Sequence, residues 1–314
     1  MKKIYVILAA ALVTACSANK VDGPAEWETE TVTVADSSDY SHVSVSIQLP
    51  LANDSAMTAM RNTLIGIAAS DLRGNYNNNE DFIAQSNMTY KPFEGDTTDA
   101  KAVITHGIGQ LMSIFDAMSK YTAEEDARLQ KPDSVIDPED TLVCSYPVPG
   151  EHWTYEEKCT LVDTTATYAT FSFTGYIENS TATHPYSSCG AGDITLRRSD
   201  GKWITKFFVD GAEEKMQPLL LAGMVRYFRD DCEDKSVNEK NVRSMMLLCD
   251  EHGNPVKNIP LPTIWRPVPK KEGLCLVYAQ YEVAPYAAGM PAFIIPYEDV
   301  MPYLTPEAQE LLRQ

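Results

Sequence analysis

The feature that most constrains the fold of this chain is the order of its hydrophobic patterns, in which segments with strand periodicity alternate with segments of helix periodicity. Residues 43–49 alternate apolar and polar side chains, which predicts a half-buried strand. Two stretches with helical spacing follow, over residues 57–68 and 103–118. Three further stretches are rich in strand-forming residues: 141–148, 154–162 and 167–177. This order predicts an α+β fold in which an antiparallel β-sheet is packed by helices.

Caps and turns refine this prediction in the first half of the chain. The tripeptide Asn53-Asp54-Ser55 offers a cap for the first helix, and Thr97 or Thr98 offers one for the second. The asparagine-rich residues 75–97 between them resemble a surface loop. Pro149-Gly150 predicts a turn that joins the first two strand-forming stretches.

The second half alternates hairpin and helix signals. Asp200-Gly201 predicts a hairpin between residues 193–198 and 203–209, because this pair accepts positive φ angles. A further hairpin is expected across residues 270–273. Three helical stretches are expected: 212–229, 242–248 and 303–312, the last capped by Thr305.

The first residues resemble a bacterial lipoprotein signal. Lys2 and Lys3 precede an apolar stretch over residues 4–13, and small Ala15 stands just before Cys16. The stretch is shorter than the roughly 20 apolar residues that span a bilayer. We therefore expect Cys16 to carry lipid and to hold the protein in the cell envelope, outside the cytoplasm. An ordinary secretory signal is the alternative.

These signals give the expected domain organisation. Residues 1–15 form the signal, and the polar residues 16–38 a flexible tether without an apolar period. Two consecutive α/β subdomains are expected to follow, over residues 39–165 and 166–314.

The charge limits the partners. A formal net charge of -18 and a pI near 4.6 argue against nucleic acid and anionic lipid headgroups, which would be repelled. A cationic protein is compatible with this charge. The solvation of an exported surface explains it equally well.

The cysteines favour disulfides rather than a metal. Six of the seven cysteines follow Cys16, and an even number in an exported chain suggests pairing. We expect Cys144 to pair with Cys159 across the hairpin at Pro149-Gly150, and Cys232 to pair with Cys249. The histidines and cysteines lack zinc-ligand spacing, so we expect neither a metal nor a cofactor.

A segment near the C-terminus resembles a known signature. It comprises residues 281–289 (YEVAPYAAG), residues 294–300 (IIPYEDV) and Tyr303-Leu304. Together with Tyr176 and Thr183-His184-Pro185, these residues are similar to the extracellular domain of RsiV-type lysozyme-sensing anti-sigma factors. That domain is also joined to some peptidoglycan deacetylases. The resemblance is clear over the C-terminal subdomain and weaker over residues 40–165.

The resemblance implies an α+β fold and binding outside the membrane. The sigma-binding segment, the membrane helix and the deacetylase domain of such proteins find no counterpart here, so those activities are not carried over. Ligand-binding candidates are His184, Tyr281, Tyr286 and Tyr297. The alternative is a structural corner in which the tyrosine rings are buried and the hydroxyls are hydrogen-bonded.

Motifs of hydrolases, phosphate-binding loops and zinc proteases are absent from the sequence. We therefore expect a non-enzymatic binding protein for a lysozyme-like protein or cell-wall glycan. A glycan hydrolase or lyase with an unrecognised carboxylate pair is the first alternative. A structural subunit of an envelope complex is the second.

Overall fold

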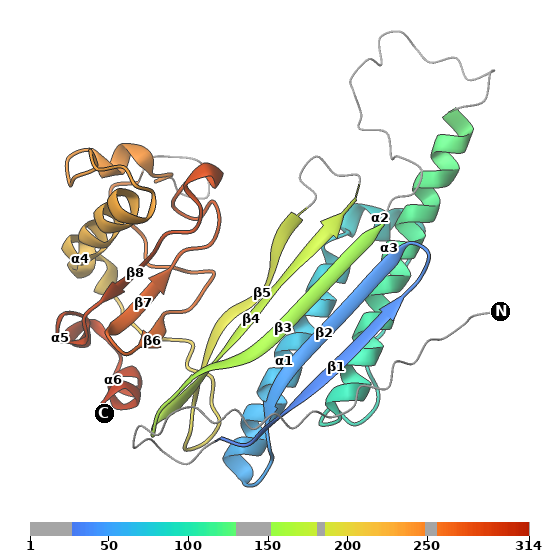
Figure 1. Cartoon of the computed structure of the whole chain (residues 1–314), viewed down its shortest axis with the longest axis horizontal. Coiled ribbons are helices and arrows are strands. Elements are labelled where there is room, and N and C mark those ends of the chain that lie inside the picture. Colours follow the sequence, from blue (N-terminus) through green and yellow to red (C-terminus); the bar gives the residue numbers. More distant parts are fainter. Residues whose placement is uncertain (1–26, 130–151, 181–185, 249–255, 314) are drawn as a thin grey trace. The chain divides into compact units, whose positions relative to one another are not determined.

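The computed structural model describes residues 27–129, 152–180, 186–248 and 256–313. The chain divides into two compact units (Figure 1). Unit 1 comprises Met1–Thr160 and Phe173–Ala191, and unit 2 comprises Leu161–Ser172 and Gly192–Gln314. The chain therefore passes between the units more than once, whereas the sequence analysis placed a single boundary after residue 165.

A five-stranded sheet organises unit 1, and its strands follow the order β1-β2-β3-β4-β5. Their bounds are Thr29–Ser37, Ser41–Pro50, Trp153–Thr164, Tyr168–Asn179 and Tyr186–Arg197. The end of β3, the start of β4 and the end of β5 belong to unit 2. β1 pairs with β2 antiparallel, but β2 pairs with β3 parallel. The α+β class is confirmed, and the sheet is mixed rather than wholly antiparallel, because the helices between β2 and β3 form a crossover that returns the chain in the same direction.

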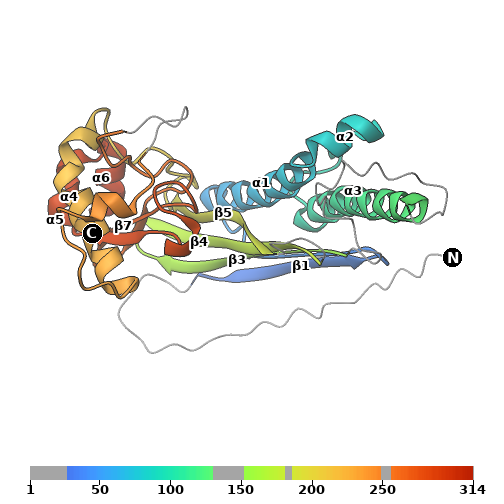
Figure 2. The same cartoon turned by 90° about the horizontal axis from the view of Figure 1, so that it is seen from above.

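The helices of that crossover are α1 (Ser55–Asn77), α2 (Glu80–Ser86) and α3 (Ala100–Leu129). α1 and α3 lie on one face of the sheet (Figure 2). The Asp54 carboxylate accepts the Met57 N–H at 2.8 Å, so the predicted cap of α1 is confirmed. α2 was expected to be a loop. α3 is capped by the Asp99 carboxylate rather than by Thr97 or Thr98.

The core of unit 1 lies between those helices and the sheet. Val43, Val45 and Ile47 of β2 are completely buried, as the alternating pattern predicted. Leu64 of α1 and Phe115 of α3 are buried with them. Their polar neighbours in β2 remain partly exposed on the other face of the sheet.

Part of the expected tether is a strand. Thr29–Ser37 forms β1, although residues 16–38 were predicted to be a flexible segment. Val32 and Val34 alternate with threonines here and lie opposite Ile47 and Val45 of β2. The acidic and hydroxyl side chains hid this alternation, since an edge strand needs little apolar surface of its own.

Residues 141–148, which were predicted to form a hairpin with β3, lie outside the described residues. β3 has β2 on one side and β4 on the other, and Cys159 lies opposite Ile47. Cys159 is a buried free thiol in the structure, and Cys144 lies outside the described residues. The disulfide predicted between Cys144 and Cys159 is therefore not present among the described residues.

Unit 2 contains a small antiparallel sheet in the order β6-β7-β8. Its strands are Val268–Lys270, Gly273–Val277 and Ala292–Ile295. The α-helices are α4 (Ala212–Arg226), α5 (Tyr297–Val300) and α6 (Pro306–Leu312), and the other helical turns are η1 (Tyr227–Asp231), η2 (Val242–Met245), η3 (Tyr286–Ala288) and η4 (Met301–Tyr303).

Several local predictions for unit 2 are confirmed. Lys270 lies opposite Gly273 in the expected hairpin, and the Thr305 hydroxyl accepts the Ala308 N–H as the cap of α6. The expected strand over residues 203–209 is wrong, because only isolated bridges form there, at Trp203 and Phe208. Residues 242–245 form a single 3-10 turn instead of a longer helix.

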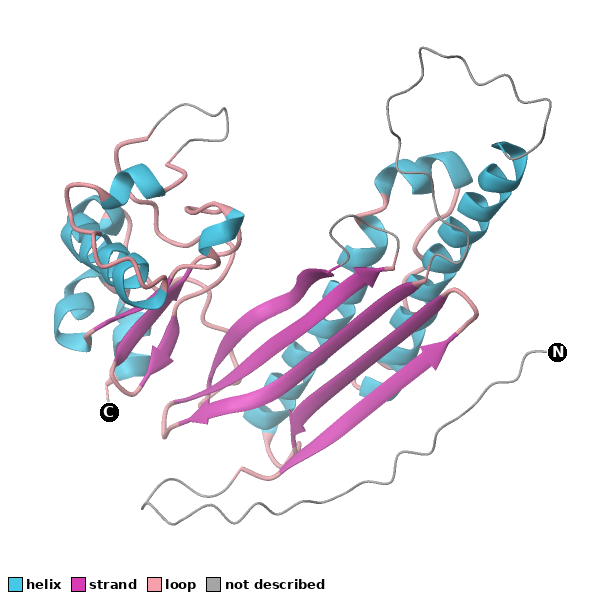
Figure 3. Cartoon of the chain, turned by 45° about the horizontal axis from the view of Figure 1, so that its top comes forward, coloured by secondary structure: helices cyan, strands magenta, loops and turns pink. Residues whose placement is uncertain are grey.

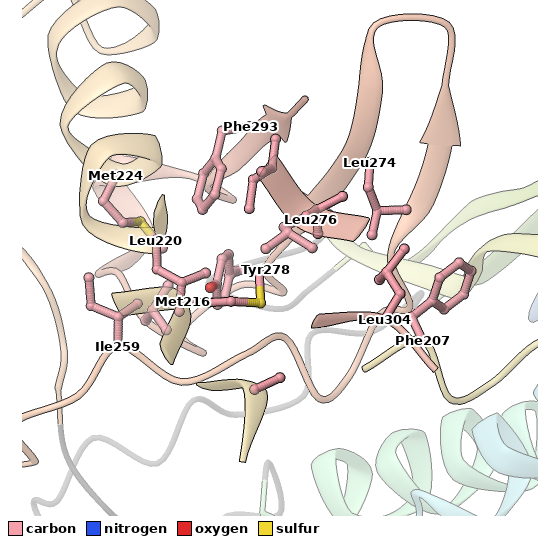
Figure 4. Packing of buried hydrophobic residues seen from close by; sticks show 14 of the residues in the cluster. Phe207, Met216, Leu220, Met224, Ile259, Leu274, Leu276, Tyr278, Phe293 and Leu304 are labelled. Atoms are coloured by element: carbon pink, nitrogen blue, oxygen red, sulfur yellow. The ribbon is translucent and has the colours of Figure 1, made fainter. Parts of the chain in front are cut away.

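An apolar core joins α4 to the small sheet (Figure 4). Met216, Leu220 and Met224 of α4 are completely buried in the cluster that also contains Leu276 and Phe293. Gly223 allows this contact, since a Cβ atom at that position would lie 2.2 Å from the Phe293 ring. In the part of the chain that the structure describes, no helix is both long and apolar enough for a membrane span.

Candidate apolar binding surface

Unit 2 exposes four large apolar side chains on residues 278–283 or on segments that hydrogen bonds link to them. Their exposed fractions are 61% for Tyr281, 60% for Ile264, 42% for Leu247 and 38% for Met290. We call these four side chains the apolar patch. A cluster of exposed apolar side chains is a common mark of a binding surface.

Backbone hydrogen bonds bring these segments to residues 278–283. The Leu247 N–H donates to the Val283 carbonyl at 2.9 Å. The Tyr278 N–H donates to the Pro291 carbonyl at 2.8 Å, which fixes the position of the neighbouring Met290. Both connections join residues that are distant in sequence.

The Glu282 carboxylate fixes the segment that carries Ile264. It accepts the Thr263 N–H at 2.6 Å, the Thr263 hydroxyl at 2.8 Å and, through its second oxygen, the Ala279 N–H at 2.8 Å. A charged acceptor strengthens each of these bonds. The glutamate therefore holds two loops together, and these loops present Ile264 and Tyr281.

Tyr281 has an unfavourable backbone conformation. Its φ angle is 65°, in the left-handed region, within a turn closed by the bond from the Glu282 N–H to the Ala279 carbonyl. A bulky residue costs about 1–2 kcal/mol in that region, where glycine or asparagine would be better suited. The chain thus places an exposed aromatic ring at a position that local geometry disfavours, which is typical of a functional residue.

The other predicted binding residues are Tyr297, Tyr286 and His184. Tyr297 is half-buried and donates its hydroxyl to the Lys270 carbonyl at 2.7 Å, as expected of a structural corner. Tyr286 begins the short turn η3, and the Tyr227 hydroxyl binds the Ala288 carbonyl at the end of that turn. His184 lies outside the described residues.

Two carboxyls lie close together in unit 1. Glu157 of β3 is 3% exposed, accepts the Tyr155 hydroxyl at 3.0 Å and lies near the partly buried Asp71 of α1. Burial raises the pKa of Glu157 far above its usual range, and the neighbouring Asp71 adds to this effect. A glycan could not reach this carboxyl without unfolding of the sheet face.

The cysteine candidates are one exposed thiol and two positions outside the described residues. Cys232 is an exposed free thiol, and its expected partner Cys249 falls outside the described residues, as does Cys16. In the described ranges, no group of three or more histidine, cysteine, aspartate or glutamate side chains could hold a metal ion.

Sequence reasoning identified Tyr281 but missed its three neighbours. Leu247, Ile264 and Met290 stand in unremarkable apolar surroundings in the sequence. Their exposure depends on contacts between segments far apart in the chain. Local patterns therefore carried no signal for them.

A comparison with protein families matches one segment that carries part of this surface. The sequence model of the DUF3298 family, described as "Protein of unknown function", matches residues 268–298. This range includes Tyr281, Glu282 and Met290. No match was found among curated proteins.

Two solved structures were matched to this chain. A crystal structure of a DUF3298 family member from Bacteroides fragilis has 13% sequence identity and a TM-score of 0.57, and the match covers 92% of this chain and 98% of that chain. A DUF3298 family protein from Pseudomonas aeruginosa has 14% identity and a TM-score of 0.44, with 91% and 97% covered. Residues 268–298 thus carry the DUF3298 signature, and the chain shares its fold with the Bacteroides fragilis protein.

Proposed function

We propose that this protein is a lipid-anchored, non-enzymatic binding protein of the cell envelope that captures a cationic, lysozyme-like protein through the apolar patch. The exposed ring of Tyr281 at a strained turn is the observation that carries the proposal. Tyrosine is enriched at the energetic centres of protein interfaces, where its ring fills a pocket of the partner.

The charge of the chain supports a basic partner. A formal net charge of -18 would attract a cationic protein and raise its association rate, and this attraction weakens as salt is added. The patch would then supply the short-range contacts. Cell-wall glycan remains a ligand of the same proposal, because sugar rings stack on exposed aromatic side chains.

The buried position of Glu157 supports a binding role over hydrolysis. A glycosidase acid must lie beside the scissile bond, with a second carboxyl about 5–10 Å away in an open site. Glu157 has the raised pKa of such an acid but is enclosed between the sheet and α1. The apolar patch also fits a permanent contact within an envelope complex, which is the second candidate.

The test is binding by the full-length protein in detergent micelles, with lysozyme and purified wall fragments as separate probes. Tyr281→Asn removes the ring and keeps a residue that tolerates the left-handed region. Tyr121→Asn removes another exposed tyrosine, on α3 in unit 1, and serves as the matched control. We expect lysozyme to bind, Tyr281→Asn to weaken binding at least about tenfold and Tyr121→Asn to change it little.

Retention of neither probe, together with stable co-purification of an envelope protein, would favour the structural subunit. Anchoring is tested separately, because Cys16→Ala should move the protein from the detergent phase to the aqueous phase. Unchanged partitioning of that variant would contradict lipid attachment.

A further inference from the structure

β1 offers an unpaired strand edge. It is the terminal strand of the order β1-β2-β3-β4-β5, and all of its nine residues pair with β2, from Thr29 opposite Pro50 to Ser37 opposite His42. Figure 3 shows β1 at the border of the sheet. Among the described residues, no strand pairs with its outer edge.

This edge lacks the usual protection against pairing. Natural sheets block their edges with proline, lysine, a bulge or a very short strand. β1 has the sequence TETVTVADS, which contains neither proline nor lysine, and its register with β2 is continuous. Its backbone is therefore suited to accept another strand.

Two apolar side chains, Val32 and Val34, lie along the same edge, and we call them the apolar ledge. Val32 and Val34 lie opposite Ile47 and Val45, on the face of the sheet against which α3 packs. The two β2 residues are completely buried, whereas Val32 and Val34 are only partly buried. An additional strand beside β1 would cover the exposed sides of both valines.

The charges of β1 favour a basic partner over a second copy of this chain. In an antiparallel pairing of two copies centred on Thr33, Glu30 of each copy would lie opposite Asp36 of the other, and like charges opposite each other destabilise a pair. Glu30 is paired with Arg61 of α1, which leaves exposed Asp36 as the main charge along the edge. A lysine or arginine of a partner strand would complement it.

We propose that the outer edge of β1 binds an extended, basic segment of a partner protein, which adds to the sheet as a further strand. Main-chain hydrogen bonds would supply affinity, and alternate apolar side chains would pack beside Val32 and Val34. This surface lies in unit 1, so it is a second binding site, independent of the patch around Tyr281.

The test uses the labelled peptide Lys-Val-Thr-Val-Thr-Val-Lys and the full-length protein in detergent, with binding followed by fluorescence polarisation. Val34→Gln places a polar side chain on the ledge, and Thr33→Gln places the same side chain one residue away on the opposite face of the sheet. We expect Val34→Gln to weaken binding at least about tenfold and Thr33→Gln less than about threefold. Thermal unfolding checks that both variants fold.

Two further probes sharpen the result. A peptide with N-methyl groups along one edge should lose binding, because it cannot form the ladder, and a peptide with glutamate in place of lysine should bind more weakly. Equal loss in the two glutamine variants would overturn the proposal. Absence of saturable binding, or self-association of the protein through β1 in light scattering, would also overturn it.

Discussion

Unit 1 buries a polar side chain where an apolar one is usual, whereas unit 2 exposes apolar side chains where polar ones are usual. Unit 1 buries a carboxyl, Glu157, beside Asp71, where water cannot solvate it. Unit 2 has an apolar core and exposes Tyr281, Ile264, Leu247 and Met290. A buried acid costs stability, whereas an exposed apolar side chain costs little by itself. The first feature should therefore affect folding, and the second should affect binding.

The largest expected effect separates the core of unit 2 from its exposed patch. Phe293→Ala removes a buried ring packed against Gly223 and should lower the free energy of unfolding by about 3–5 kcal/mol. Ile264→Ala, in the patch, should change it by less than about 0.5 kcal/mol. Chemical denaturation measures both. Equal effects would show that the patch is part of the core.

The next effect concerns the buried acid of unit 1. Glu157→Gln keeps the shape and removes the titrating group, so folding near neutral pH no longer requires the uptake of a proton. We therefore expect an increase of about 2 kcal/mol in the free energy of unfolding at that pH. The folded-state pKa of Glu157 is raised, so its contribution to stability is complete below the unfolded pKa of about 4.5 and is lost as pH rises toward the folded value.

The difference between the wild-type protein and this variant should consequently grow from about pH 5 to about pH 8. Urea titrations at several pH values measure it, and Glu156→Gln, one residue away in β3, is the control. A constant difference across this range would mean that Glu157 is not protonated in the folded protein.

A smaller effect is expected at the start of α1. Asp54→Ala removes the carboxylate that accepts the Met57 N–H and should lower the stability of unit 1 by about 1 kcal/mol. Asp54→Asn should recover most of this loss, since its side-chain oxygen can cap the helix. Hydrogen exchange of α1 amides distinguishes this local change from one that reaches unit 2.

The smallest expected change in stability is at the strained turn. Tyr281→Asn should leave the free energy of unfolding within about 0.5 kcal/mol, because asparagine tolerates the left-handed region. Tyr281→Val should lower it by about 0.5–1 kcal/mol, because a β-branched side chain is less suited to that region than the tyrosine that already occupies it. If both variants lost the same stability, the ring rather than the backbone would determine the effect.

The sequence predicted local structure better than it predicted pairing. The alternation at Val43–Val45–Ile47, the cap at Asp54 and the hairpin at Lys270–Gly273 depend on neighbouring residues, and all three are confirmed. The parallel pairing of β2 with β3 depends on a crossover of three helices, which no local pattern records. β1 was missed because its short β-branched alternation stands among acidic residues.

The candidate surface was likewise predicted only in part. Tyr281 was identified through its motif, but the same reasoning could not separate it from Tyr297, which is hydrogen-bonded to Lys270 and half-buried. The difference between these tyrosines arises from tertiary contacts. Glu282 holds the 263–264 loop beside Tyr281, and no periodicity relates residues so far apart.

Titration of lysozyme into the full-length wild-type protein, Tyr281→Asn and Tyr121→Asn tests the central claim most directly. The account predicts saturable binding that weakens with added salt, at least about tenfold loss for Tyr281→Asn and almost none for Tyr121→Asn, with equal stability of the three proteins. Binding that is unchanged in Tyr281→Asn would contradict the assignment of the apolar patch as the binding surface.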